Sequence, residues 1–292
     1  MDLNKLLKEK LLKLLPKENI CNTTIESLRI ARIDTINNKP NRCFYKPMIS
    51  LIISGKKECS IGIKNFSCEE GQYMIVGFDI PSKTFIKNIS KESPFLAISL
   101  EIDPKIILEL EKELLPIKRK DDYFKGIAIA NIDNDLLGTA LRLLNLLDDN
   151  EKNQKILAPM IIKEMYYRIL IGPIGDKLRS LNNVEAKSNK IAQVIMYLKD
   201  NYEKALNIKD LAKSVNMTPT TFYRHFKKMT NFSPLQYQKQ LRLYIAHNLI
   251  TIDNQNATNT AYMVGYESVT QFNREYKRIF GEPPIRSIKK LQ

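Results

Sequence analysis

A short pattern occurs twice near the C-terminal end of the chain, at a constant offset of 50 residues. The first copy occupies residues 218–228 and the second occupies residues 268–278, and the agreement continues to Pro234 and Pro284. An internal repeat of this kind indicates a duplicated structural unit. The matched pairs are Thr218/Ser268, Thr220/Thr270, Phe222/Phe272, Arg224/Arg274, Phe226/Tyr276 and Lys227/Lys277.

Each copy predicts one helix. Thr218 and Ser268 are good N-caps, and Pro219 suits the first helical position, where no N–H is needed. The aromatic residues of each copy are four apart, so they form an apolar stripe that faces a core. A turn precedes each copy and contains Asn216 or Gly265, the two residue types that best tolerate a left-handed backbone. Because another short helix precedes each turn, the sequence predicts two helix-turn-helix units.

The polar face of each predicted recognition helix carries the candidate DNA-binding residues. Arg224 and Arg274 are the best candidates for reading bases, because a guanidinium pairs well with O6 and N7 of guanine. Lys227, Lys277 and Arg278 are expected at phosphates, which position a protein without reading sequence. The complete candidate set is Thr220, Tyr223, Arg224, Lys227, Thr270, Gln271, Arg274, Lys277 and Arg278.

A long helix is predicted to connect the two units, from Ser233–Pro234 to about Ile250. Two recognition helices held by one rigid helix are expected to enter successive major-groove segments, ~34 Å apart, on one side of a duplex. A single chain would then read a whole site.

Positive charge is concentrated in the same part of the chain. Residues 186–292 contain 17 Lys and Arg against 7 Asp and Glu, whereas the first 185 residues contain 29 against 25. Such a distribution indicates a polyanionic partner. A membrane surface is the alternative, but this segment has no Lys-rich amphipathic helix with a wide apolar face.

The repeat region closely resembles the DNA-binding domain of AraC-type transcriptional regulators. Residues 222–237 read FYRHFKKMTNFSPLQY, and residues 271–284 read QFNREYKRIFGEPP. The resemblance covers roughly 190–288 and implies double-stranded DNA as the partner. Asn231 stands where the family usually has Gly, but Asn also accepts a positive φ. The segments that carry the resemblance are 222–237, 241–243, 264–268 and 271–284.

Short strands are predicted from Thr23 to about Ile102, with Gly and Pro between them, which is typical of a small β-barrel or sandwich. Part of this region is similar to the N-terminal, cupin-like domain of one subgroup of AraC-type regulators. The segments concerned are 45–47, 54–57, 70–73 and 94–100. The fold class expected is therefore α+β multidomain: an N-terminal cupin-like β-barrel with flanking helices, then an all-α domain with two helix-turn-helix units. A purely structural barrel without a ligand is the alternative interpretation.

Helices are predicted on both sides of these strands. An amphipathic helix spans residues 2–15 and ends at Pro16, and residues 103–171 read as helical, with a linker at 172–188. Two apolar stripes in this region serve either the core or a dimer interface. The first consists of Leu136, Leu137, Ala140, Leu141, Leu144 and Leu147, and the second of Ile156, Met160, Ile161, Met165 and Ile169. The domain organisation expected is a lead-in helix at 1–22, a regulatory domain at 23–115, a helical segment and linker at 116–187, and a DNA-binding domain at 188–292.

The sequence predicts no enzyme, no metal site and no cofactor. The only two histidines, His225 and His247, lie outside the β region, so a cupin metal site and a His-dependent catalytic set are not expected there. His225 lies on the first recognition helix but is not expected to contact a base, and His247 is expected to pack or lie at the surface. A phosphate-binding Gly-rich loop is also absent from the sequence.

The four cysteines lack metal-ligand spacing and suit a reducing compartment. We interpret them as packing residues; oxidant or electrophile sensing at Cys59 and Cys68 is the alternative. Because no apolar run approaches 18 residues and no signal peptide begins the chain, a soluble, cytoplasmic protein without membrane contact is expected. The cysteines are Cys21, Cys43, Cys59 and Cys68.

These features predict a sequence-specific, DNA-binding transcriptional regulator controlled by a small-molecule or stress signal sensed in the N-terminal domain. One alternative is a cupin-type small-molecule-binding protein or enzyme with an accessory nucleic-acid-binding module. Another is a general nucleoid or RNA-binding protein, against which the two differently decorated recognition faces argue. Besides DNA, the candidate partners are RNA polymerase, a small-molecule effector and a second copy of the chain; no residue is assigned to the effector.

Overall fold

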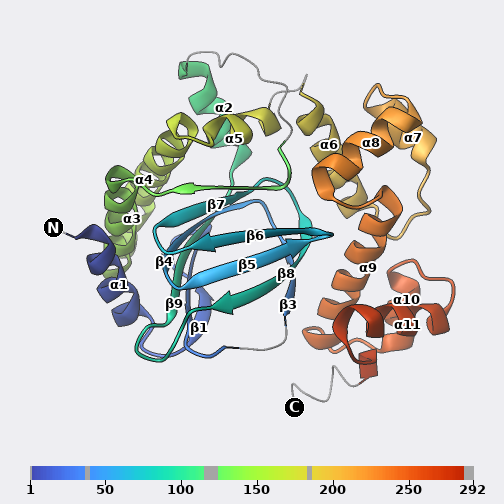
Figure 1. Ribbon diagram of the computed structural model, residues 1–292, viewed down its shortest axis with the longest axis horizontal. Coiled ribbons are helices and arrows are strands. Elements are labelled where there is room, and N and C mark those ends of the chain that lie inside the picture. The colour runs from blue at the N-terminus through green and yellow to red at the C-terminus, as the bar shows by residue number, and fades with distance from the viewer. Residues whose placement is uncertain (1, 37–39, 115–123, 183–185, 286–292) are drawn as a thin grey trace.

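The computed structural model describes residues 2–36, 40–114, 124–182 and 186–285 (Figure 1). Its strands form one antiparallel sheet of six strands and one of four. The larger sheet has the order β1 (Asn19–Asn22), β2 (Leu28–Ile33), β9 (Phe95–Glu101), β4 (Met48–Ser54), β7 (Gln72–Val76), β10 (Ile127–Asn131). The smaller sheet has the order β3 (Asn41–Tyr45), β8 (Ile80–Lys87), β5 (Lys56–Ile61), β6 (Lys64–Glu69).

The fold class predicted from the sequence is confirmed in its main division, a β-rich N-terminal part with flanking helices and a helical C-terminal part with two helix-turn-helix units. The prediction of a closed β-barrel is wrong. Closing a barrel requires every strand to pair with a neighbour on each side. In the part of the chain that the structure describes, no ladder joins the two sheets, so they are separate layers.

The two faces of the six-stranded sheet have different neighbours. In β2, Arg32 donates hydrogen bonds to the carbonyls of Leu15 and Pro16, at the end of α1 (Leu3–Leu14). Successive strand residues point to opposite faces, so Leu28 and Ile30 lie on this helix-covered face with Arg32. The other face carries fully buried side chains too, such as Met74. We infer that the four-stranded sheet covers that second face.

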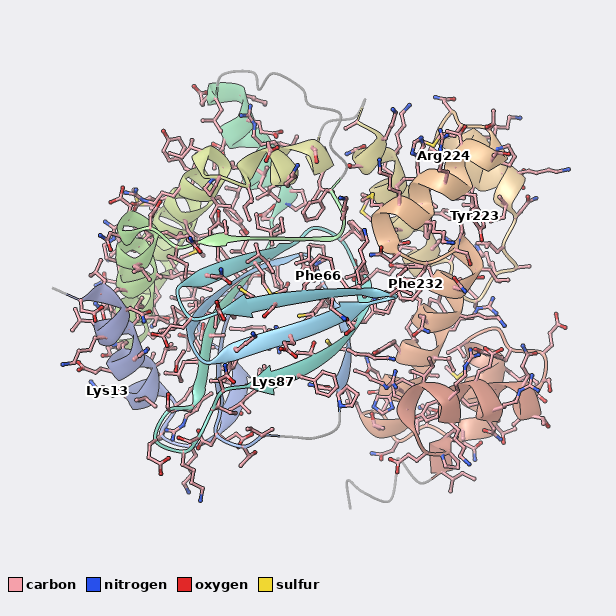
Figure 2. The ribbon with its side chains drawn as sticks, in the orientation of Figure 1. Lys13, Phe66, Lys87, Tyr223, Arg224 and Phe232 are labelled. Atoms are coloured by element: carbon pink, nitrogen blue, oxygen red, sulfur yellow. The ribbon has the colours of Figure 1, made fainter. Side chains whose placement is uncertain are left out.

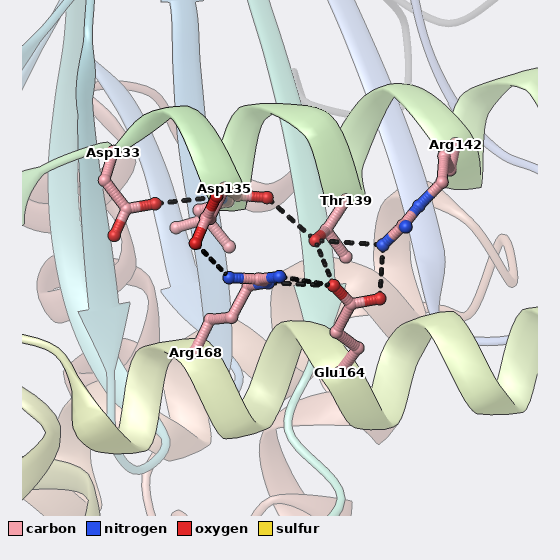
Figure 3. A network of polar contacts seen from close by, with 7 residues as sticks. Asp133, Asp135, Thr139, Arg142, Glu164 and Arg168 are labelled. Carbon is pink, nitrogen blue, oxygen red and sulfur yellow. Dashed lines mark hydrogen bonds and ion pairs between the residues drawn. The ribbon is translucent and has the colours of Figure 1, made fainter.

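Two further helices flank the six-stranded sheet, α3 (Asn134–Asn145) and α4 (Glu151–Ile171), and a polar network joins them (Figure 3). Glu164 accepts hydrogen bonds from Thr139 and Arg168, at 3.1 and 2.8 Å, and pairs with Arg142. Arg168 also pairs with Asp135 at 2.6 Å. Because these side chains are partly exposed, the network contributes little free energy but fixes how the two helices align.

Two segments differ from the sequence-based prediction. β10 lies within residues 103–171, where the sequence predicts helix, and its five residues pair with β7. Its apolar run is too short for periodicity to distinguish strand from helix, and only the partner strand decides.

The predicted linker at 172–188 contains α5 (Gly175–Asn182). The other helix of this region, α2 (Pro104–Glu113), begins at the predicted Asp103 cap. The division into four domains stays a prediction.

The C-terminal part is entirely helical within the described residues, as predicted. Ser233 and Gln236 form a reciprocal capping box at the start of the long connecting helix. The residue after α8, Asn231, has φ 62°, the left-handed value that Asn tolerates. The helices are α6 (Lys187–Asp200), α7 (Ile208–Ser214), α8 (Pro219–Thr230), α9 (Pro234–Thr251), α10 (Ala257–Met263) and α11 (Val269–Phe280).

Helix α9 docks the helical part on the outer side of the small sheet, beside β3 and β8 (Figure 1). The Tyr237 hydroxyl donates to the Asp79 carbonyl at 2.6 Å, and the Tyr244 hydroxyl donates to the Ser82 carbonyl at 3.3 Å. The ring of Phe44 on β3 makes edge contacts with both tyrosine rings, with centroids 5.8 and 5.5 Å apart. Aromatic packing and two buried hydrogen bonds therefore hold the two parts together.

The apolar core is divided between the two helix-turn-helix units. The first unit, with Phe222 and Phe226, belongs to one continuous core with the β region. The second unit has a separate core around Phe272 and Tyr276. Figure 2 shows Phe232, after α8, at the tip of the β5–β6 hairpin. The first unit is thus built into the β region, whereas the second is attached through α9.

Within the described ranges, no helix has both the length and the apolar character that crossing a membrane requires.

We expect Tyr237→Phe to destabilise the docked arrangement, because it leaves the buried Asp79 carbonyl without its donor. An unsatisfied buried acceptor lowers the free energy of unfolding by about 1–3 kcal/mol. Denaturant unfolding of the full chain, followed by circular dichroism, measures this loss. Tyr223→Phe is the matched control, because Tyr223 is 45% exposed on α8 and should change little. Equal stability of wild type and Tyr237→Phe would contradict the assigned bond.

Candidate nucleic-acid interface

The first helix-turn-helix unit consists of α7, a turn at 215–218, and α8. Asn216 has φ 54° in the turn, and the Met217 N–H closes it on the Ala212 carbonyl at 2.9 Å. Phe222 and Phe226 are completely buried on one side of α8. The opposite side of α8 is therefore free to face outward.

The predicted contact residues of α8 lie on its outward side. Thr220, Tyr223, Arg224 and Lys227 are all exposed, and Figure 2 labels Tyr223 and Arg224 on this helix. His225 points inward, with 6% of its surface exposed. Burial, with the nearby Arg224 and other cations, lowers the pKa of His225 below its usual value.

The second unit consists of α10, a turn with Gly265 at φ 83°, and α11. Four of its predicted contact residues are exposed, and Gln271 is half-buried. Helices α8 and α11 pack near the two ends of α9 (Figure 1). The exposed residues are Thr270, Arg274, Lys277 and Arg278.

A carboxylate that sequence analysis missed lies on the inward side of α11. Glu275 is 8% exposed, and its Oε1 accepts from Lys239 Nζ at 2.8 Å and from Gln271 Nε2 at 3.2 Å. Its Oε2 accepts from the Tyr266 hydroxyl at 2.9 Å. Burial opposes ionisation, but the three hydrogen bonds outweigh it and hold the pKa of Glu275 below its usual value. The signal in the sequence was an acidic residue at the repeat position that His225 occupies in the first copy.

Arg242 joins the second unit to the end of α6. Its guanidinium donates to the carbonyls of Tyr202, Glu203 and Lys204, at 2.7 to 3.0 Å, and to the Gly265 carbonyl at 2.8 Å. A Cβ at position 265 would lie 2.4 Å from the Glu203 carbonyl oxygen, so the close approach requires glycine. Arg242 thus stabilises the turn and is not available to DNA.

A polar cluster lies on the inner side of the small sheet. The Tyr45 hydroxyl contacts Thr84 Oγ1 at 2.6 Å and Cys59 Sγ at 3.5 Å. Lys57 Nζ lies 4.8 Å from the centre of the Tyr45 ring. In the described ranges no carboxylate lies within ion-pair distance of Lys57, and Ser82 Oγ, also buried, has no hydrogen-bond partner.

All four cysteines carry free thiols. Burial raises the pKa of Cys43, and it raises the pKa of Cys68 to about 12. These two thiols therefore stay protonated near neutral pH, and a protonated thiol is a poor nucleophile. Across the described part of the chain, no group of three or more His, Cys, Asp or Glu side chains could hold a metal ion.

Two models of known protein families match this chain. The family model described as the N-terminus of AraC-type transcriptional regulators matches residues 24–177, and a helix-turn-helix domain model matches residues 211–289. The first match spans more than half of the chain. The chain belongs to the AraC-type transcriptional regulators.

Curated relatives are similar over part of their length. A lactose operon transcription activator from Staphylococcus xylosus is 25% identical over 48% of this chain and 48% of its own. The raffinose operon regulatory protein RafR from Pediococcus pentosaceus is 26% identical over 44% of this chain and 47% of its own. The chain therefore matches about half the length of these relatives.

Among solved structures, an apo single-residue variant of ToxT from Vibrio cholerae strain SCE256 superposes with a TM-score of 0.59 at 13% identity. The match covers 94% of this chain and 100% of that chain, so the whole arrangement of β region and helices is similar. Wild-type ToxT of the same strain was solved with an unsaturated fatty acid bound, and that structure has a TM-score of 0.55.

The lowered pKa of Glu275 leads to a pH prediction. The usual pKa of a Glu side chain is 4.5. As the pH falls below this value, the unfolded chain binds a proton at residue 275 more readily than the folded chain does. The stabilisation is therefore present above pH 4.5 and is lost as the pH falls through the folded pKa. Melting temperatures between pH 6 and 3 should fall less steeply for Glu275→Gln than for wild type. Glu267→Gln, exposed in the preceding turn, is the control and should follow the wild-type slope.

Proposed function

We propose that this chain is a sequence-specific, DNA-binding transcriptional regulator that acts in the cytoplasm, without catalytic activity of its own. The observation that carries the proposal is the pair of recognition helices, α8 and α11, each with an exposed Arg at the same repeat position. Both helices pack on α9, so a duplex would meet them as one rigid pair. The names of the curated relatives, an operon activator and an operon regulator, support this class of function.

Each predicted contact residue has a proposed role. Arg224 and Arg274 read guanine bases in the major groove, since a guanidinium matches O6 and N7. Lys227, Lys277 and Arg278 contact phosphates, because they lie in the last turns of their helices, away from the N-terminal residues that reach bases. Thr220, Tyr223, Thr270 and Gln271 complete the two recognition faces.

The test is selection of duplexes from a randomised library by the full chain, followed by affinity measurements at several salt concentrations. Arg274→Ala should lose about 1–3 kcal/mol of binding free energy at particular base pairs and relax the preference there. Lys277→Ala should weaken all sequences alike and reduce the salt slope by about one. Equal loss on every duplex for Arg274→Ala would refute its role, and failure of wild type to enrich any sequence would refute sequence-specific binding.

We also propose that the small-molecule effector binds between the two sheets beside Lys57 and is an organic acid. An ammonium group without a carboxylate partner among the described residues favours an anionic ligand. The buried, unpartnered hydroxyl of Ser82 offers a further polar contact in this layer. The carboxylic acid bound to ToxT belongs to that protein, but its chemistry agrees with this assignment.

A thermal-shift screen of carboxylic acids, each paired with its methyl ester, tests the effector site. An acid at 100 times its Kd should stabilise the full chain by about 2.7 kcal/mol, whereas its ester should not. Lys57→Met should abolish the shift. Lys56→Met is the matched control, because Lys56 is the next residue on the opposite face and lies 3.9 Å from Glu58. An acid that still stabilises Lys57→Met would contradict the site.

A second copy of the chain is a further proposed partner. Part of the predicted apolar stripe of α4 is buried, as at Met165 and Ile169, but Ile156 and Met160 are 55% and 65% exposed. Exposed apolar side chains in a row on one helix are typical of protein–protein contacts. We propose α4 as the surface through which a homodimer forms.

A further inference from the structure

The amide of Gln271 has a defined orientation on the second recognition helix. Its nitrogen lies 3.2 Å from Oε1 of Glu275, one helical turn later. An ionised carboxylate only accepts hydrogen bonds, so the amide nitrogen, and not the amide oxygen, must face it. The carbonyl oxygen of Gln271 therefore points away from Glu275.

Glu275 is itself held in place from two other elements. Lys239 on α9 donates to the same oxygen that Gln271 contacts, and Tyr266 in the turn donates to the other oxygen. With these partners and its 8% exposure, Glu275 does not reach the surface of α11. Rotation of its carboxylate would break at least one of these bonds, so the orientation of the Gln271 amide is set by the second unit as a whole.

Gln271 is placed where base contacts occur. It is the third residue of α11, and the N-terminal residues of a recognition helix are those that meet base edges. A glutamine without a neighbouring partner turns either its N–H or its carbonyl toward the groove. Here one of the two amide N–H groups is engaged by Glu275, and the carbonyl oxygen, which points away from Glu275, is left for the DNA.

We propose that Glu275 is a positioning residue that makes Gln271 present its carbonyl oxygen to the major groove, so that the second unit selects a base with an exocyclic amine. The bases with such a donor in the major groove are adenine, through N6, and cytosine, through N4. Guanine and thymine offer acceptors at the corresponding edge, and these cannot bond the carbonyl oxygen. This inference rests on the proposed DNA-binding function and adds the specificity of one position.

The two halves of the binding site then differ. At the repeat offset of 50 residues, the first unit has Thr221 in place of Gln271 and His225 in place of Glu275. Thr221 accepts the Thr218 hydroxyl at 3.0 Å within the cap of α8, so it has no comparable role. The positioned amide is therefore a feature of α11 and not of α8, and the site is not a simple repeat of one half.

The experiment compares base preferences of full-length wild type, Gln271→Leu and Glu275→Gln on the duplex selected by wild type. The position read by Gln271 is the one whose preference disappears in Gln271→Leu. Wild type should favour adenine or cytosine there by about two- to tenfold, the range one hydrogen bond supports. In Glu275→Gln, which can pair with either end of the Gln271 amide, this preference should fall below about twofold.

Removing the amine from that base gives an independent measurement. Purine in place of adenine, or pyrimidin-2-one in place of cytosine, should weaken wild-type binding by the same two- to tenfold and leave Gln271→Leu unchanged. Tyr266→Phe is the matched control, because it removes one bond to Glu275 but keeps the bond to Gln271. It should retain the wild-type preference.

Each outcome has one meaning. Guanine or thymine at the Gln271 position, or an undiminished preference in a folded Glu275→Gln variant, overturns the inference while sequence-specific binding stands. Should Glu275→Gln melt before it can be assayed, the amine-removal series on wild type and Gln271→Leu decides alone. Loss of all sequence preference in wild type refutes the proposed function instead.

Discussion

The position of the long helix α9 against the small sheet determines the arrangement of the rest of the chain. The Tyr237 hydroxyl of α9 donates to the carbonyl of Asp79. The carboxylate of Asp79 also pairs with Lys199 of α6, at 2.9 Å. The contact thus binds two helices of the C-terminal part to one turn of the β region. Because the Tyr237 bond is buried, it is stronger than an equivalent bond at the surface, and breaking it leaves the Asp79 carbonyl unsatisfied.

This docking gives the two DNA-binding units unequal surroundings. The first shares its apolar core with the β region, and the backbone of Asn231 approaches the β5–β6 turn so closely that a Cβ on Gly62 would lie 2.8 Å from it. The second has its own core and depends on α9 and Arg242 for its position. Packed side chains therefore connect the β region directly to α8, and α9 connects it to α11.

The same polar chemistry has different consequences in the two parts. Inside the β region, Tyr45, Thr84 and Cys59 satisfy one another. Among the described residues, Lys57 has the Tyr45 ring but no carboxylate as a partner, and Ser82 Oγ has no hydrogen-bond partner. Unpartnered polar groups in a buried layer destabilise a fold unless another molecule meets them. In the second helix-turn-helix unit, Glu275 has a partner for each oxygen, so its charge links the recognition helix to α9 and to the preceding turn.

The repeat of caps, turn residues and aromatic spacing determined α8, α9 and α11 closely, because these signals act within a few residues along the chain. The exposed positions of Arg224 and Arg274 follow from the same spacing. Only the tertiary structure decided that the strands form two open sheets, that residues 127–131 join β7, and that Glu275 controls Gln271. Each of these depends on partners far apart in the sequence or on a side chain's hydrogen bonds, and neither periodicity nor composition records which distant groups will meet.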